Sequence, residues 1–83
     1  MYIVLCYDVN EKRCGKYLNV CKKYLLHLQS SVFAGSISES KYSTLMKEID
    51  KIKIEEDKIL IYKTPSIKYV DVVSIPEIGI IES

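Results

Sequence analysis

A short apolar run at the start of the chain constrains the fold most. Residues 2–7 read Tyr-Ile-Val-Leu-Cys-Tyr, and Asp8 closes the run. Such β-branched and aromatic residues, followed by a polar stretch, indicate a buried strand. Asp8 therefore stands at the exit of a rigid element, where oxygen ligands for a hard cation acting on phosphates can be held. One carboxylate is too few, so other ligands must come from elsewhere in the chain or from Asp8 of a symmetric partner.

Residues 13–28 carry apolar side chains at helical spacing. The apolar positions recur every three or four residues, as they do on one face of an amphipathic helix. They are Cys14, Tyr17, Leu18, Cys21, Tyr24, Leu25 and Leu28. The opposite face is mostly basic. The pattern predicts one helix across this segment, with a wide core stripe and a basic outer surface.

A second helix is predicted after Ser38, because serine is a favoured N-cap residue. Its apolar stripe comprises Tyr42, Leu45, Met46, Ile49 and Ile52. Strands are predicted on both sides of this helix: residues 29–37, bent or bulged at Gly35, and residues 58–64, which Pro65 ends. A fourth strand at 67–74 and a short strand or tail at 79–81 follow.

These elements give the order β-α-β-α-β-β plus a tail within a single domain, residues 1–83. Two helices on one face of an antiparallel sheet form an α+β sandwich of the ferredoxin-like kind. A domain of this size buries only about 60–65% of the surface that its unfolded chain exposes. The apolar tail also has no obvious place in a four-stranded sheet. We therefore expect a homodimer in which the C-terminal strand is exchanged with the partner.

Composition narrows the class of protein. No apolar stretch approaches the roughly 18 residues of a membrane span. The N-terminus also lacks the basic region of a signal peptide. We therefore expect a cytoplasmic protein that does not associate with a membrane. The net charge of +1 argues against a simple electrostatic binder of nucleic acid, although a local basic patch stays open. Cys6, Cys14 and Cys21 lack metal-binding spacing and are expected to be buried free thiols.

Several segments, taken in order, resemble one known family. They are Tyr-Ile-Val-Leu-Cys-Tyr-Asp at 2–8, Arg13 with Lys16, Gln-Ser-Ser-Val-Phe-Ala-Gly at 29–35, and Asp-Lys-Ile-Leu-Ile-Tyr at 57–62. Together they resemble the small CRISPR-associated adaptation protein, the ferredoxin-like subunit that works beside the CRISPR integrase. The resemblance covers nearly the whole chain, and the combination of its first and third segments is fairly specific.

The resemblance implies a homodimer whose two strand-end aspartates face each other across the two-fold axis and hold Mg²⁺ or Mn²⁺. Some family members cleave single-stranded RNA or double-stranded DNA. In the integration complex a dimer lies between integrase dimers and carries the middle of the new spacer DNA. The motif positions of this chain are Tyr7, Asp8, Arg13, Ser31 and Phe33. Many members have two or three arginines where this chain has Arg13 alone.

Each candidate residue has a functional role and an ordinary alternative. Asp8 is the predicted catalytic and metal-binding residue, but it could simply cap a turn. Arg13 is also a predicted catalytic residue, and with Lys12 and Lys16 it is predicted to bind nucleic acid. Positive charge in the first turn opposes the helix dipole, which favours binding over a solvated surface. Ser31, the third predicted catalytic residue, would ligate a metal-bound water or be an edge-strand polar residue.

The predicted function is that of a CRISPR adaptation subunit, a metal-dependent, endonuclease-like homodimer that binds DNA or RNA and bridges integrase dimers. A bound ion would polarise the scissile phosphate and lower the pKa of an attacking water, and Arg13 would stabilise charge on the phosphoryl oxygens. Two alternatives stay open. One is a non-catalytic DNA scaffold. The other is a ferredoxin-like RNA- or ligand-binding module, although the aromatic, glycine-rich strand signature of RNA-recognition motifs is absent.

Overall fold

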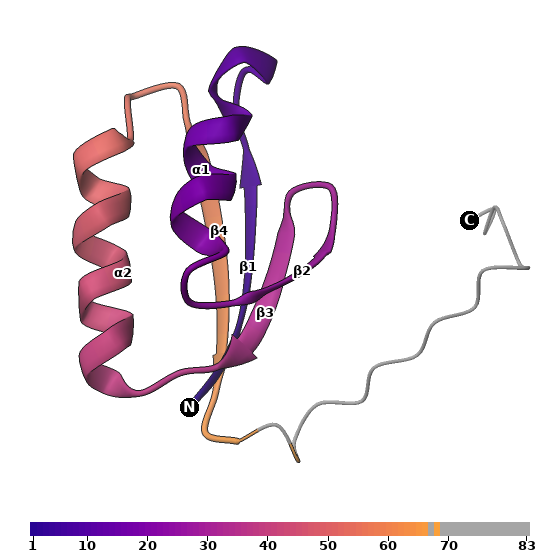
Figure 1. Cartoon of the computed structure of the whole chain (residues 1–83), viewed down its shortest axis with the longest axis vertical. Helices are drawn as coiled ribbons and strands as arrows, with labels where there is room; N and C mark the ends of the chain where they lie inside the picture. The colour runs from indigo at the N-terminus through magenta and orange to yellow at the C-terminus, as the bar shows by residue number, and fades with distance from the viewer. Residues whose placement is uncertain (67, 69–83) are drawn as a thin grey trace, which may run out of the picture.

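The computed structural model describes residues 1–66 and 68, and these form one antiparallel sheet with two helices (Figure 1). The strands are β1 (Tyr2–Asp8), β2 (Leu26–Gln29), β3 (Val32–Ser36) and β4 (Lys58–Thr64). Their order across the sheet is β2-β3-β1-β4, and every neighbouring pair is antiparallel. A short 3₁₀ helix η1 (Glu11–Arg13) leads into α1 (Cys14–Cys21), and α2 (Glu39–Ile52) is the longer helix. The predicted α+β, ferredoxin-like sandwich is confirmed.

Strand β1 is one of the two inner strands of the sheet. Its side chains point alternately to the two faces of the sheet, and these faces differ chemically. Ile3, Leu5 and Tyr7 point toward the helices and are buried. Leu5 lies opposite Phe33 of β3 on one side and Ile61 of β4 on the other. Because successive side chains of a strand alternate between faces, Asp8 belongs to the face away from the helices.

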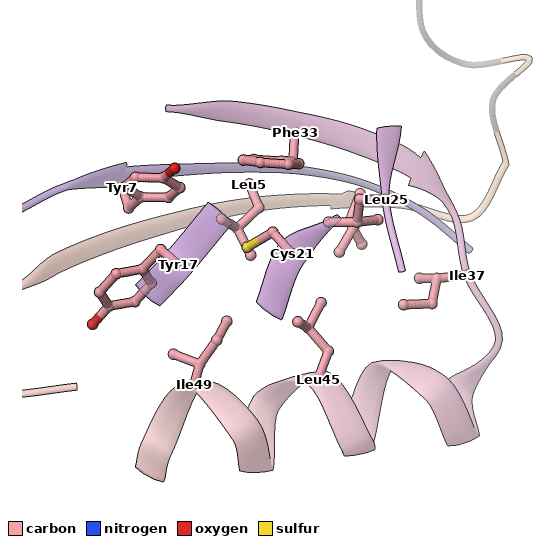
Figure 2. Packing of buried hydrophobic residues seen from close by; sticks show 10 residues of the cluster. Leu5, Tyr7, Tyr17, Cys21, Leu25, Phe33, Ile37, Leu45 and Ile49 are labelled. Atoms are coloured by element: carbon pink, nitrogen blue, oxygen red, sulfur yellow. The ribbon is translucent and has the colours of Figure 1, made fainter. Parts of the chain in front are cut away.

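The core fills the space between the sheet and both helices. Figure 2 shows Leu5, Tyr7 and Phe33 on the sheet side, with Leu45 and Ile49 of α2 across from them. Tyr17 and Cys21 of α1 belong to the same cluster and are fully buried. Three aromatic rings run through it, because Tyr7 stacks on Tyr17 at 5.1 Å between ring centroids and lies 6.1 Å from Phe33. Both helices therefore cover the same face of the sheet.

Helix α2 forms where the sequence predicts it. Ser38 is its N-cap residue, and the Ser38 Oγ accepts a hydrogen bond from the Lys41 N–H at 3.1 Å. Leu45 and Ile49 are buried on the side that faces the sheet. An N-cap hydroxyl satisfies one of the backbone donors that the first helical turn leaves unpaired, which fixes the start of the helix.

The prediction of one helix over residues 13–28 was correct for Cys14–Cys21 and wrong beyond it. Helix α1 ends at Cys21, the Leu25 N–H donates to the Cys21 carbonyl, and residues 26–29 form β2. Leu25 is buried, whereas Leu26 and Leu28 are exposed. Residues 26–29 thus lie in a hairpin with β3, where cross-strand hydrogen bonds replace helical ones. The order in the described residues is consequently β-α-β-β-α-β, not the predicted β-α-β-α-β-β.

The same hairpin corrects the predicted strand at 29–37. Strand β3 is limited to Val32–Ser36, and Gly35 pairs regularly with Ile3. The register shift lies instead in β2, between His27 and Gln29. Ser30 has a φ of 37°, the left-handed conformation that a tight turn requires. The predicted strand at 67–74 and the strand or tail at 79–81 lie outside the described residues.

The cysteines and the membrane prediction have simple outcomes. All three thiols are free, but only Cys21 is buried, while Cys6 and Cys14 are partly exposed, so the prediction of three buried thiols was wrong for these two. Burial raises the pKa of the Cys21 thiol to about 11. Among residues 1–66 and 68, no helix is long and apolar enough to cross a bilayer.

Candidate functional site

Asp8 ends the central strand and is exposed. It lies opposite Lys58, the first residue of β4, in the antiparallel register. A pocket adjoins it, lined by Cys6, Tyr7, Asp8, Lys58, Ile59 and Leu60. The strand end thus places a carboxylate beside a solvent-accessible hollow, as the sequence predicts for this residue.

The sheet face away from the helices is apolar beside Asp8. Four residues of β1 and β4 define this outer sheet face: Val4, Cys6, Leu60 and Tyr62. Cys6 pairs with Leu60, and Val4 pairs with Tyr62. Leu60 is 53% exposed and Tyr62 is 58% exposed. Large apolar side chains exposed side by side are typical of a surface that another molecule covers.

The donor groups available for a metal ion are few in one copy of the chain. Nowhere in the described part of the chain do three or more His, Cys, Asp or Glu side chains gather into a group that could hold a metal. Divalent cations such as Mg²⁺ take six oxygen ligands, usually including waters, and one or two carboxylates. Asp8 fits such a site as a single ligand, so a complete one requires further oxygens from a second copy, from substrate or from water.

Arg13 lies at the junction of η1 and α1, and its guanidinium points inward. Its Nε atom donates to both carboxylate oxygens of Asp57 at 3.1 Å, and its Nη2 atom donates to Asp57 Oδ2 at 2.7 Å. The Nη2 atom also donates to the Ile52 carbonyl at the end of α2. The Arg13 side chain is 19% exposed, and that of Asp57 is 1% exposed. This ion pair closes the α2–β4 connection onto the start of α1.

Tyr17 completes the cluster around Asp57. Its hydroxyl donates to Asp57 Oδ2 at 2.6 Å, and the Ile54 N–H donates to the same oxygen at 3.2 Å. Burial, and then the hydrogen bond to the Asp57 carboxylate, raise the pKa of Tyr17 to about 12. The Arg13 hydrogen bonds, with those of Tyr17 and Ile54, hold the pKa of Asp57 well below its usual range. Charge-assisted hydrogen bonds of this kind favour an ionised carboxylate.

The other residues that the sequence singles out lie in three parts of the fold. Lys12 and Lys16 are exposed on η1 and α1, which leaves their ammonium groups free to approach a phosphate backbone. Ser31 lies in the turn between β2 and β3, and its carbonyl accepts a hydrogen bond from the Tyr7 N–H at 3.2 Å. The fold thus brings Ser31 to the same end of the sheet as Asp8. Phe33 and Tyr7 are buried in the core.

Sequence reasoning missed the role of Asp57. It follows Glu55 and Glu56, and the sequence marks it only as the first residue of the 57–62 segment, with no role of its own. Of these three acidic residues only Asp57 is buried, because it accepts hydrogen bonds from Arg13 and Tyr17. These two residues lie 44 and 40 positions earlier in the chain. The local sequence does not reveal a partner for Asp57, so only the three-dimensional arrangement identifies its role.

Comparisons with known proteins agree on one family. The family model described as CRISPR associated protein Cas2 matches residues 1–72. A protein of Dictyoglomus turgidum named CRISPR-associated endoribonuclease Cas2 is 43% identical over 70 residues, which cover 83% of this chain and 80% of that protein. A protein of Thermotoga maritima with the same name is 42% identical over 69 residues, covering 82% and 79% of the two chains.

Solved structures show the same relationship. A crystal structure of Cas2 superposes with a TM-score of 0.82 at 31% identity and covers 100% of this chain and 95% of its own. Streptococcus pyogenes Cas2, crystallised at pH 6.5, has a TM-score of 0.73 at 24% identity, covers 89% of this chain and 100% of its own, and supports the fold alone. Since the family model spans most of the chain and relatives exceed 40% identity, this protein belongs to the Cas2 family of CRISPR-associated proteins.

Proposed function

We propose that this protein is a CRISPR adaptation subunit that acts as a homodimer, binds nucleic acid and bridges integrase dimers. We further propose that the dimer is a metal-dependent endonuclease acting on phosphodiester bonds of RNA or DNA. One observation carries the proposal: an exposed carboxylate, Asp8, ends the central strand at the border of an exposed apolar sheet face. The names of the similar proteins, which are endoribonucleases, agree with a phosphodiester substrate.

The outer sheet face supports the dimer. Leu60 and Tyr62 are more than half exposed, and a second copy packed on them would remove both from water. Because Asp8 follows Cys6 on the same side of β1, this packing would place the two Asp8 side chains near a shared two-fold axis. The interface and the candidate site would then both be built from the neighbouring strands β1 and β4.

Two carboxylates at such an axis would supply the oxygen donors that one chain lacks. Like charges held close together repel, and a divalent cation relieves that repulsion. A bound Mg²⁺ or Mn²⁺ would polarise the phosphate and lower the pKa of a bound water. Asp8 would hold and orient the ion, and the hydroxyl of Ser31 would lie at the same end of the sheet to orient water.

Nucleic acid would be held by exposed lysines. Lys12 and Lys16 flank the entry to α1, close in sequence to Asp8. The net charge of +1 implies that these contacts are few and that the isolated dimer binds weakly at physiological salt. An integrase bound on both sides would add the remaining contacts with DNA.

A matched pair of variants tests the role of Asp8. Asp8→Asn and Glu11→Gln each remove one exposed negative charge per copy, and Glu11 belongs to η1 only three residues further on. We expect Asp8→Asn to abolish cleavage in the presence of Mn²⁺ or Mg²⁺ and Glu11→Gln to retain it. Circular dichroism of both variants serves as the folding control. Full cleavage by a folded Asp8→Asn variant would remove Asp8 from the chemistry.

The second candidate function is a non-catalytic scaffold, which is favoured because the guanidinium of Arg13, a predicted catalytic residue, is bound to Asp57. Spacer integration with the integrase present separates the two functions. Integration that survives Asp8→Asn supports bridging as an activity independent of cleavage. Integration that is lost in a folded Asp8→Asn dimer would contradict an independent scaffold role.

A further inference from the structure

Arg13 is the only arginine among the twelve basic residues of the chain, and its guanidinium is occupied within the protein. Arginine is suited to phosphate recognition because its planar fork binds two oxygens at once. Here the fork instead binds Asp57 through Nε and Nη2, while Nη2 also reaches the Ile52 carbonyl. The sequence predicts that Arg13 contacts phosphate, whereas in the structure its guanidinium forms an ion pair inside the protein.

The ion pair connects to Asp8 by two short routes. Asp57 directly precedes Lys58, and Lys58 lies opposite Asp8 between β4 and β1. Asp57 also accepts a hydrogen bond from Tyr17, whose ring stacks on Tyr7, the neighbour of Asp8 in β1. The end of β1 at Asp8 and the start of β4 at Lys58 are therefore both linked to the buried carboxylate of Asp57.

We propose that Arg13 and Asp57 form a positioning pair that fixes the strand ends around Asp8, and that Arg13 makes no contact with nucleic-acid phosphates. The second half of the proposal rests on the proposed function, since it assumes a nucleic-acid substrate. Lys12 and Lys16, exposed on either side of Arg13, take the phosphate contacts instead. Asp57 and Tyr17 thereby become part of the machinery without touching substrate.

The alternative, in which Arg13 swings out to a phosphate, carries a specific penalty. Asp57 is 3% exposed, and Arg13 is its only cationic partner among the described residues. Removing one member of a buried ion pair leaves an uncompensated charge, which is strongly unfavourable. The Ile52 carbonyl at the end of α2 would also lose its donor. A solvated lysine can reach a phosphate without any of these losses.

The first experiment measures the salt dependence of nucleic-acid binding. Arg13→Gln and Lys16→Gln each remove one positive charge, three residues apart, and fluorescence anisotropy with duplex DNA is recorded from 50 to 200 mM salt. Each phosphate contact contributes about 0.9 to the slope of log K against log salt. We expect Lys16→Gln to lower the slope by up to about that amount and Arg13→Gln to leave it unchanged. A similar decrease for Arg13→Gln would overturn the proposal.

The second experiment reads the position of Asp8 directly and needs no substrate. Backbone amide ¹H–¹⁵N spectra of Asp57→Asn and of Arg13→Gln should show shifted Asp8 and Lys58 resonances, while Lys16→Gln leaves them in place. Arg13→Lys keeps the charge and should restore part of the wild-type positions. If either Asp57→Asn or Arg13→Gln unfolds the protein, Tyr17→Phe and Arg13→Lys perturb the same cluster more mildly. Unmoved Asp8 and Lys58 resonances in a folded variant would overturn the positioning role.

Cleavage kinetics separate failure of this inference from failure of the proposed function. A positioning pair predicts that Arg13→Gln and Asp57→Asn each lower kcat with little change in KM, and that the double variant is no worse than the worse single one. Independent losses that multiply would indicate that Arg13 acts on the substrate itself. A wild-type protein that neither binds nor cleaves nucleic acid would refute the proposed function, and the amide spectra would still decide the positioning role.

Discussion

A polar substitution on the outer sheet face should weaken the proposed dimer by a predictable amount. Fully burying a leucine side chain contributes about 1.5–3 kcal/mol. Leu60 is 53% exposed, so burying this exposed part against a partner would stabilise the dimer by about 1 kcal/mol. A two-fold dimer contains this residue twice, and Leu60→Ser should therefore cost the dimer about 2 kcal/mol. That corresponds to a dissociation constant raised roughly 30-fold.

The assay is sedimentation equilibrium over a range of concentrations that spans dissociation. Ile54→Ser is the matched control, because Ile54 is a 41% exposed isoleucine in the α2–β4 connection and lies outside the outer sheet face. We expect the control to dissociate as the wild-type protein does. Tyr62→Ser should weaken the dimer more than Leu60→Ser, because a tyrosine that is 58% exposed presents a larger area to the partner.

Two results would refute this reasoning. A wild-type protein that stays monomeric at the highest concentration would mean that the outer sheet face has no second copy as its partner. A Leu60→Ser dimer as stable as the Ile54→Ser dimer would place the interface on another surface. In both cases the two Asp8 side chains would no longer be expected at a common axis, and the metal site proposed from them would lose its second carboxylate.

Three further predictions concern stability. Ser38→Ala should lower the free energy of unfolding by about 1 kcal/mol, whereas Ser38→Gly should lower it by only a few tenths, as measured by urea denaturation. The folded pKa of Tyr17 is raised from 10.0 to about 12, so its stabilising effect is complete below pH 10 and is lost as the pH rises toward 12; the stability gap between wild type and Tyr17→Phe should narrow over that range. The folded pKa of Asp57 is lowered from 3.8, so the gap between wild type and Asp57→Asn should be full above about pH 5 and shrink as the pH falls through and below 3.8. A gap that did not change with pH would contradict either assignment.

The sequence predicted the elements whose local pattern agrees with their tertiary surroundings. Strand β1 and helix α2 were predicted correctly, because the apolar run at 2–7 and the stripe after Ser38 each face one core. Strand β2 was missed for the opposite reason. Leu25 and Leu28 continue the helical spacing of α1, but residues 26–29 pair with β3 instead, and a pairing partner is not visible in a local period.

The candidate site divides in the same way. The exposure of Asp8 follows from its place at the end of a strand, which the sequence shows directly. The partner of Arg13 lies 44 residues further along the chain, and the sequence offers three adjacent acidic residues with no means of choosing among them. The resemblance and the opposed helix dipole predicted a phosphate contact for Arg13, and the fold pairs this side chain with the buried Asp57 carboxylate.

Alternation along β1 explains how one short strand serves both the fold and the site. Ile3, Leu5 and Tyr7 belong to the core, so changes there act on stability first. Cys6 and Asp8 lie on the other face, where substitutions can alter assembly and chemistry at little cost to folding. Tyr7 is a core residue that also bears on the site, because its ring stacks on Tyr17, and Tyr17 donates a hydrogen bond to Asp57. In the positioning pair that we propose, the place of the exposed Asp8 carboxylate depends on the buried cluster around Asp57. Substitutions in that cluster should therefore change the proposed cleavage activity although the residues touch no substrate.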